Sequence, residues 1–164
     1  MNLFPRVISL SLFVLALSAA HAADLGPAPA PAPAAKEKDT LAGARAQIAA
    51  RNWSGAIDEL KRVNATGSAD WNNLMGYSLR KSKTPDLAAS EKYYNDALRI
   101  DPQHRGTLEY SGELYLMKGD LPKAEQRLAA LDAACNRACT EYADLKRAIE
   151  RYKASGQKYV ASDY

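Results

Sequence analysis

The sequence predicts an all-α protein made of repeated helix–turn–helix units, and three observations lead to this prediction. Apolar residues recur three and four positions apart, as on one face of a helix, at Leu121, Ala124, Leu128 and Leu131. The segment that begins at Gly76 is echoed 36 residues later by a similar segment at Gly112. A repeat near that length is typical of two-helix units that stack into a solenoid. No segment shows the apolar alternation of a strand.

Helix-start signals precede the expected second helix of each unit. Asn52, Thr84 and Asp120 are residue types that cap helix N-termini through their side-chain oxygens. Pro85 and Pro122 would fall in the first turn, where a missing N–H does little harm. These signals predict helices that begin just after residues 52, 84 and 120.

A further helix is expected over residues 140–154, with Thr140 as its N-cap residue. Repeat arrays need a terminal helix that covers the last exposed face. We therefore expect this helix to cap the array through one apolar stripe, formed by Tyr142, Leu145, Ile149 and Tyr152.

The two ends of the chain are expected to lie outside the folded domain. Arg6 precedes an apolar run from Val7 to Ala20, and Ala22 ends a small-residue site of the kind that signal peptidases read, so residues 1–22 resemble a secretory signal. The run is too short to span a bilayer as a helix. Cleavage would deliver the chain to the periplasm or outside the cell; an uncleaved anchor is the alternative.

A Pro/Ala-rich linker is expected over residues 23–38. Alternating Pro and Ala cannot form a helix or a central strand, so this segment would be an extended, semi-rigid spacer. The helical repeat domain would then occupy residues 39–154, and residues 155–164 would form a flexible tail.

The charge balance excludes two classes of partner. Removal of residues 1–22 takes away Arg6 and no acid, which leaves 21 basic against 19 acidic side chains. A charge this small gives no basic stripe for nucleic acid. There is also no sustained basic amphipathic helix for a membrane surface, so we expect no membrane insertion after signal cleavage.

At these residues the chain resembles the tetratricopeptide repeat (TPR) family, a helix–turn–helix repeat of 34 residues. The third unit matches the family's small and large positions at Gly112, Tyr115, Gly119, Ala124 and Leu128. The second unit matches at Gly76, Tyr94, Ala97 and Pro102, with two extra residues in the intervening turn and Ser90 in a small-residue position. The first unit, residues 39–63, is degraded. The resemblance implies about three TPR-like units and a C-terminal capping helix.

The resemblance also implies a concave groove that binds a peptide or helix of another exported protein. The family's groove positions carry over to Asn73, Tyr77, Arg80, Lys81, Glu109, Glu113, Leu116 and Met117. The groove would be basic near Arg80 and acidic near Glu113, with Tyr77 as an apolar contact and Arg80 as a donor to a carboxylate. The alternative is that these charges form an ordinary solvated face.

Cys135 and Cys139 are the only cysteines, and in an exported chain such a pair is first expected to form a disulfide. Closing this short loop would stabilise the fold by about 2 kcal/mol. Bridging would be strained if both residues lay on one unbroken helix. The alternative is a thiol-redox or copper carrier, because two nearby thiols can bind Cu(I), with His104 as a possible third ligand.

Catalytic signatures are missing from the sequence. No Gly-rich phosphate loop, His-Glu-x-x-His or Gly-x-Ser-x-Gly motif occurs, and His104 is the only histidine left after signal cleavage. We therefore expect a non-catalytic binding protein that needs no cofactor.

Overall fold

The computed structural model describes residues 39–160 of the chain. The expected signal peptide, residues 1–22, and the expected Pro/Ala linker, residues 23–38, lie outside the described residues, as do residues 161–164 of the expected tail. Among the residues described, no helix is long and apolar enough to cross a bilayer.

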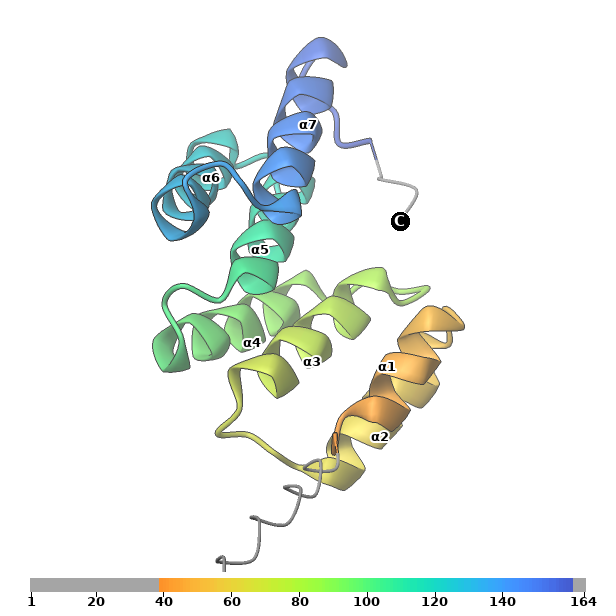
Figure 1. The fold of residues 1–164 in the computed structure, drawn as a ribbon. Helices are drawn as coiled ribbons and strands as arrows, with labels where there is room; N and C mark the ends of the chain where they lie inside the picture. Colours follow the sequence, from red (N-terminus) through yellow and green to blue (C-terminus); the bar gives the residue numbers. More distant parts are fainter. Residues whose placement is uncertain (1–38, 161–164) are drawn as a thin grey trace, which may run out of the picture. The chain divides into compact units, whose positions relative to one another are not determined.

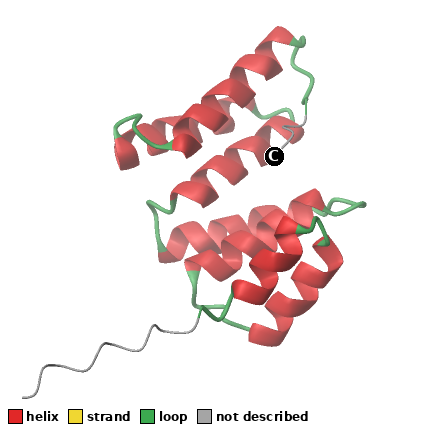
Figure 2. Ribbon diagram, turned by 45° about the vertical axis from the view of Figure 1, so that its right-hand side comes forward, coloured by secondary structure: helices red, strands yellow, loops and turns green. Residues whose placement is uncertain are grey.

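Seven α-helices and their connecting turns make up residues 39–160, which contain no strand (Figure 2). The prediction of an all-α fold is confirmed. In chain order the helices are α1 (Ala42–Ala49), α2 (Trp53–Val63), α3 (Ala69–Lys81), α4 (Leu87–Ile100), α5 (Arg105–Met117), α6 (Leu121–Cys135) and α7 (Thr140–Ala154).

The helices pack as consecutive pairs, α1 with α2, α3 with α4 and α5 with α6, and α7 packs against α5 and α6 (Figure 1). Each odd-numbered helix also contacts the next odd-numbered one, so that α1, α3, α5 and α7 form one row. The even-numbered helices of residues 39–160 contact only odd-numbered ones. The odd-numbered helices therefore approach one another on one side, while the even-numbered helices lie apart on the other.

Side-chain caps explain where most of the helices begin. Asn52 caps α2 by accepting a hydrogen bond from the Gly55 N–H, and Asp120 caps α6 in the same way, as predicted. The prediction that Thr84 starts α4 was wrong, because Asp86 is the N-cap residue and accepts from the Ala89 N–H.

The start of α7 also differs from the prediction by one residue. Thr140 is the first residue of the helix, and Cys139, which is bonded to Cys135, occupies the N-cap position without a side-chain cap.

Two apolar clusters form the interior. One lies around α1, α2 and α3 and contains Leu41, Ala44, Leu60, Trp71, Leu74 and Met75. The other lies around α5, α6 and α7, and includes three residues of the predicted α7 stripe, Leu145, Ile149 and Tyr152. The helix expected to cap the array thus buries its apolar side against α5 and α6.

Gly76 and Gly112, the two glycines of the sequence repeat, allow close contacts between helices, but each lies against a different partner helix. A Cβ atom at Gly76 would lie 2.7 Å from Tyr94 Cε1 and 3.2 Å from the Ser90 carbonyl oxygen, both on α4. A Cβ atom at Gly112 would lie 2.5 Å from Leu145 Cδ2, on α7. Gly76 therefore brings together the two helices of one pair, whereas Gly112 admits α7.

We predict that Gly76→Ala destabilises the protein by roughly 1–3 kcal/mol, because the added methyl group overpacks a fully buried ring and a helix backbone. The matched control is Gly106→Ala on α5, whose Cβ would meet Asn73 Nδ2 at an ordinary 3.4 Å. Urea unfolding should show the first variant weakened and the second unchanged or more stable. Equal effects of the two substitutions would contradict close packing at Gly76.

Candidate functional site

The predicted groove residues on α3 and α5 meet at a buried ion pair. Arg80 Nη1 lies 2.7 Å from Glu113 Oε2, and only 1% of each side chain is exposed. Sequence reasoning placed these charges toward opposite ends of a groove, and that expectation was wrong for this pair. Residues 80 and 113 come together because α3 and α5 are neighbours in the row of odd-numbered helices.

Three tyrosines surround the guanidinium group of Arg80. Arg80 Nε donates a hydrogen bond of 3.3 Å to the Tyr94 hydroxyl. The guanidinium carbon lies 5.4 Å from the centroid of the Tyr77 ring and 5.7 Å from that of Tyr110, within cation–π range. The Tyr77 and Tyr110 centroids are 4.6 Å apart. We call Tyr77, Arg80, Tyr94, Tyr110 and Glu113 the Arg80 cluster.

The protonation states within this cluster follow from its burial and its charges. Burial alone would lower the pKa of Arg80, but Tyr94 and Glu113 raise that pKa above its ordinary value. Burial raises the pKa of Tyr94 to about 12, against the opposing effect of Arg80. At neutral pH Arg80 is therefore a cation, and Tyr94 is a neutral phenol that accepts its hydrogen bond.

Glu109, one helical turn before Glu113, is buried with 4% of its surface exposed. Burial raises the pKa of its carboxyl group to about 8, with smaller contributions from Glu113, Asp144 and Glu141, while Arg80 opposes the shift. At neutral pH most molecules therefore hold Glu109 protonated, so that its carboxyl group can donate a hydrogen bond as well as accept one.

The remaining predicted groove residues divide into buried and accessible ones. Leu116 is buried in the apolar cluster of α5–α7. Asn73 is also buried, and its Oδ1 atom has no hydrogen-bond partner among the described residues. Lys81 and Met117 are half-buried at the ends of α3 and α5. Lys81 Nζ lies 6.0 Å from the Tyr77 centroid, and Met117 Sδ lies 4.0 Å from Arg80 Nη1.

Sequence reasoning missed the aromatic residues that complete this region. Tyr110 follows the predicted Glu109 directly, and Trp53 makes an edge-to-face contact with Tyr77 at 5.8 Å. The family's groove positions do not include them, so only the density of tyrosines near Arg80 and Glu109 could have suggested a cluster.

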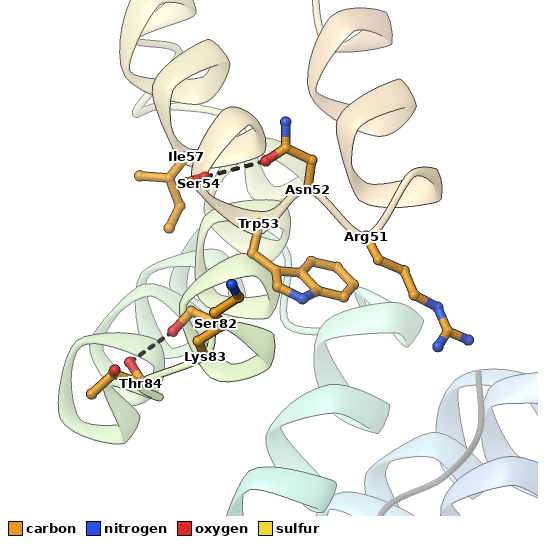
Figure 3. A pocket seen from close by; sticks show the side chains of 8 residues that line it. All are labelled: Arg51, Asn52, Trp53, Ser54, Ile57, Ser82, Lys83 and Thr84. Atoms are coloured by element: carbon orange, nitrogen blue, oxygen red, sulfur yellow. Dashed lines mark hydrogen bonds between the residues drawn. The ribbon is translucent and has the colours of Figure 1, made fainter.

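A separate surface pocket lies at the turns that join α1 to α2 and α3 to α4 (Figure 3). It is lined by Arg51, Asn52, Trp53, Ser54, Ile57, Ser82, Lys83 and Thr84. Several of these polar groups form hydrogen bonds with one another. The Ser54 hydroxyl donates to Asn52 Oδ1, and the Ser82 hydroxyl donates to the Thr84 carbonyl oxygen. Trp53 links the two regions, because it lines the pocket and also contacts Tyr77.

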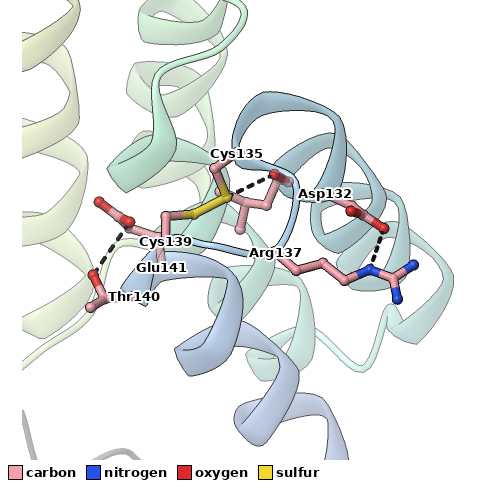
Figure 4. The surroundings of a disulfide bond; sticks show 7 residues. Asp132, Cys135, Arg137, Cys139, Thr140 and Glu141 are labelled. Carbon is pink, nitrogen blue, oxygen red and sulfur yellow. Dashed lines mark hydrogen bonds and ion pairs between the residues drawn. A yellow bond between two sulfur atoms is a disulfide. The ribbon is translucent and has the colours of Figure 1, made fainter.

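Cys135 and Cys139 are joined by a disulfide bond between α6 and α7 (Figure 4). Asn136 and Arg137 adopt left-handed backbone conformations, with φ of 48° and 63°, and end α6 between the two cysteines. The pair therefore does not lie on one unbroken helix, which was the condition for doubting the bridge.

His104, the possible third ligand for a metal, has a local structural role. Its Nδ1 accepts the hydrogen bond that caps α5 from the Thr107 N–H, and its Nε2 lies 3.0 Å from Asp70 Oδ1. Within residues 39–160, no group of three or more His, Cys, Asp or Glu residues is placed to hold a metal ion.

No protein-family model matches the chain, and a search of curated proteins found no match either. What the site does must therefore be inferred from its own residues. They bring together aromatic rings, a cation that is almost completely buried against Glu113 and, one helical turn away, a carboxyl group that is protonated at neutral pH.

We predict that Glu109 makes the protein less stable as the pH rises from about 4.5 to about 8. Between the ordinary pKa of 4.5 in the unfolded chain and the pKa of about 8 in the folded protein, unfolding releases a proton from this carboxyl group, so the free energy of unfolding falls as the pH rises, and the slope ends once both states are ionised. Glu109→Gln should flatten this slope in urea unfolding, with a change on the order of a few kcal/mol at most. Glu150→Gln, the same change at an exposed position of α7, is the control; parallel slopes for all three proteins would refute the assignment.

We also predict that the variant with both Cys135→Ala and Cys139→Ala loses about 2 kcal/mol of unfolding free energy, because the unfolded chain is no longer constrained. Adding reductant should lower the stability of the wild type to that of the variant and leave the variant unchanged. A wild type that is insensitive to reductant would show that the bridge contributes no stability.

Proposed function

We propose that residues 39–154 form a TPR-like array of three units with α7 as its capping helix. The consecutive helix pairs, the contacts along the row of odd-numbered helices and the close approach at Gly76 all support this interpretation. In such an array the odd-numbered helices line the concave side, because the even-numbered helices diverge from one another.

We propose further that this side is a non-catalytic binding surface for a peptide or helix of another protein. The observation that carries the proposal is the burial of Arg80, Glu109 and Glu113 between two apolar clusters. Burying charged groups is costly, and apolar residues of similar volume often stabilise such positions better. Three ionisable groups buried at such a cost therefore favour a role in recognition over a role in stability alone.

The composition of the surface favours a peptide as the ligand. Tyrosine, tryptophan and arginine dominate the energetics of protein interfaces, and Tyr77, Tyr110, Trp53 and Arg80 are gathered here. Lys81 and Met117, which are partly accessible, would contact the bound segment at the edge of the cluster.

The partner would be another exported protein, met in the periplasm or outside the cell. The signal-like residues 1–22 support export, and the Cys135–Cys139 disulfide is compatible with an oxidising compartment. The array would act there as a scaffold.

The alternative function, a thiol-redox or copper carrier, has less support. Cys135 and Cys139 are bonded to each other, and both ring nitrogens of His104 interact with neighbours on α3 and α5.

Site-specific photo-crosslinking in the native envelope tests the binding surface. Benzoylphenylalanine would replace Lys81 or Met117 at the edge of the cluster, and Asn95 or Arg99 on the exposed side of α4 as matched controls. We expect discrete protein adducts from positions 81 and 117 only. Adducts from α4 alone, or equally from both sides, would place the interface elsewhere.

A further inference from the structure

A second group of charged and aromatic side chains gathers around Tyr115, on the side of α5 that faces away from the Arg80 cluster. Residues 113 and 115 are two positions apart on one helix, a rotation of about 200°, so Tyr115 points away from Glu113 and its partner Arg80. Tyr115 is buried, with 4% of its surface exposed. We call Glu91, Tyr115, Lys118, Lys123 and Arg127 the Tyr115 cluster.

The cluster joins α4 and α6 to α5, the helix on which both of them pack (Figure 1). The Tyr115 hydroxyl donates a hydrogen bond of 3.2 Å to Glu91 Oε1 on α4, and Lys118, just after α5, forms an ion pair with the same carboxylate. Lys123 Nζ and the guanidinium carbon of Arg127, both on α6, lie 5.1 Å and 5.6 Å from the centroid of the Tyr115 ring. Two cations of one helix thus share a single aromatic ring, within cation–π range.

Positive charge exceeds negative charge in these contacts. Lys118 is paired with Glu91, and Lys123 is paired with Asp120 at 3.2 Å. Within residues 39–160 no ion pair involves Arg127, and its Nε atom is buried without a hydrogen-bond acceptor there. Lys123 and Arg127 are also four positions apart, a spacing at which like charges repel each other on a helix. One positive charge of the cluster is therefore left without a carboxylate.

The pKa of Glu91 reflects this positive charge. The hydrogen bond and the charge of Lys118, with smaller contributions from Tyr115 and Lys123, lower the pKa of this carboxyl group against the effect of its burial. The cations are also accessible to solvent, because 37% of the Lys118 side chain and 50% of the Lys123 side chain are exposed and Arg127 is half-buried. A negatively charged group of another molecule can therefore approach them.

We propose that the Tyr115 cluster is a second binding site, which holds a side-chain carboxylate from an acidic segment of a partner protein between Lys123 and Arg127. The guanidinium group of Arg127 matches a carboxylate with two parallel N–H donors, and Lys123 adds a point charge beside it. One bound carboxylate neutralises the one unbalanced positive charge, whereas the double charge of a phosphate group would exceed it. The site lies on a different face of α5 from the Arg80 cluster, so it does not depend on the function proposed for that cluster.

Fluorescence anisotropy with a labelled hexaglutamate peptide and the full chain tests this site. We expect saturable binding that weakens as the salt concentration rises, and no binding of a hexaglutamine peptide. Arg127→Gln and Lys123→Gln should each weaken binding about tenfold, because charge-assisted hydrogen bonds to the carboxylate are lost. Arg127→Lys, which keeps the charge, should lose less.

The matched control is Lys146→Gln on α7, where the lysine side chain is similarly exposed, and this variant should bind as wild type. Equal weakening by Lys146→Gln would show that the peptide responds only to the overall charge of the protein, and would overturn the proposal. Absence of hexaglutamate binding to the wild type would overturn it as well.

A second measurement needs no variant and so does not depend on how a variant folds. In an NMR titration of the wild type, hexaglutamate should shift the Nε–H signal of Arg127 and the ring signals of Tyr115, and leave the ring signals of Tyr77 and Tyr110 in place. Shifts at Tyr77 and Tyr110 instead would place the acidic segment at the Arg80 cluster and refute the proposal. Shifts at Arg127 with inorganic phosphate but not with hexaglutamate would assign the site to phosphate groups and refute it too.

Discussion

The ion pair between Arg80 and Glu113 is the interaction on which the central part of the fold depends. It joins α3 to α5 between two apolar clusters, with both side chains almost completely buried. An isolated buried charge is far more costly than a paired one, so either residue needs the other: loss of one partner of a buried pair typically costs about 3–5 kcal/mol. The pair therefore constrains how the second and third helix pairs meet.

The same requirement explains the polar and aromatic residues around the pair. A guanidinium group has five N–H donors, and those of a buried arginine need acceptors or aromatic faces nearby. Tyr94 from α4 supplies an oxygen, and Tyr77 from α3 and Tyr110 from α5 supply ring faces. Residues of α3, α4 and α5 thus meet around Arg80.

Much of the helical framework could be predicted from local pattern. Asn52 and Asp120 cap the helices that they were expected to cap, and Leu145, Ile149 and Tyr152 face the core as their spacing indicated. The errors in the predicted N-cap residues were small shifts along the chain. Asp86, not Thr84, is the N-cap residue of α4, and Cys139, not Thr140, is the N-cap residue of α7. Cap identity depends on which backbone N–H groups a side chain can reach, and spacing alone does not determine that.

By itself, the sequence determined the all-α class and the approximate positions of the helices, because helix periodicity and capping act over a few residues. It also showed the repeat that places Gly76 and Gly112 in similar segments. Only the tertiary structure decided that Arg80 and Glu113 meet, and that Gly76 and Gly112 lie against different helices. The contacts Gly76–Tyr94, Arg80–Glu113 and Gly112–Leu145 join residues that are about 18 to 33 positions apart along the chain. They depend on how whole helices pack, so a local pattern in the sequence cannot predict them.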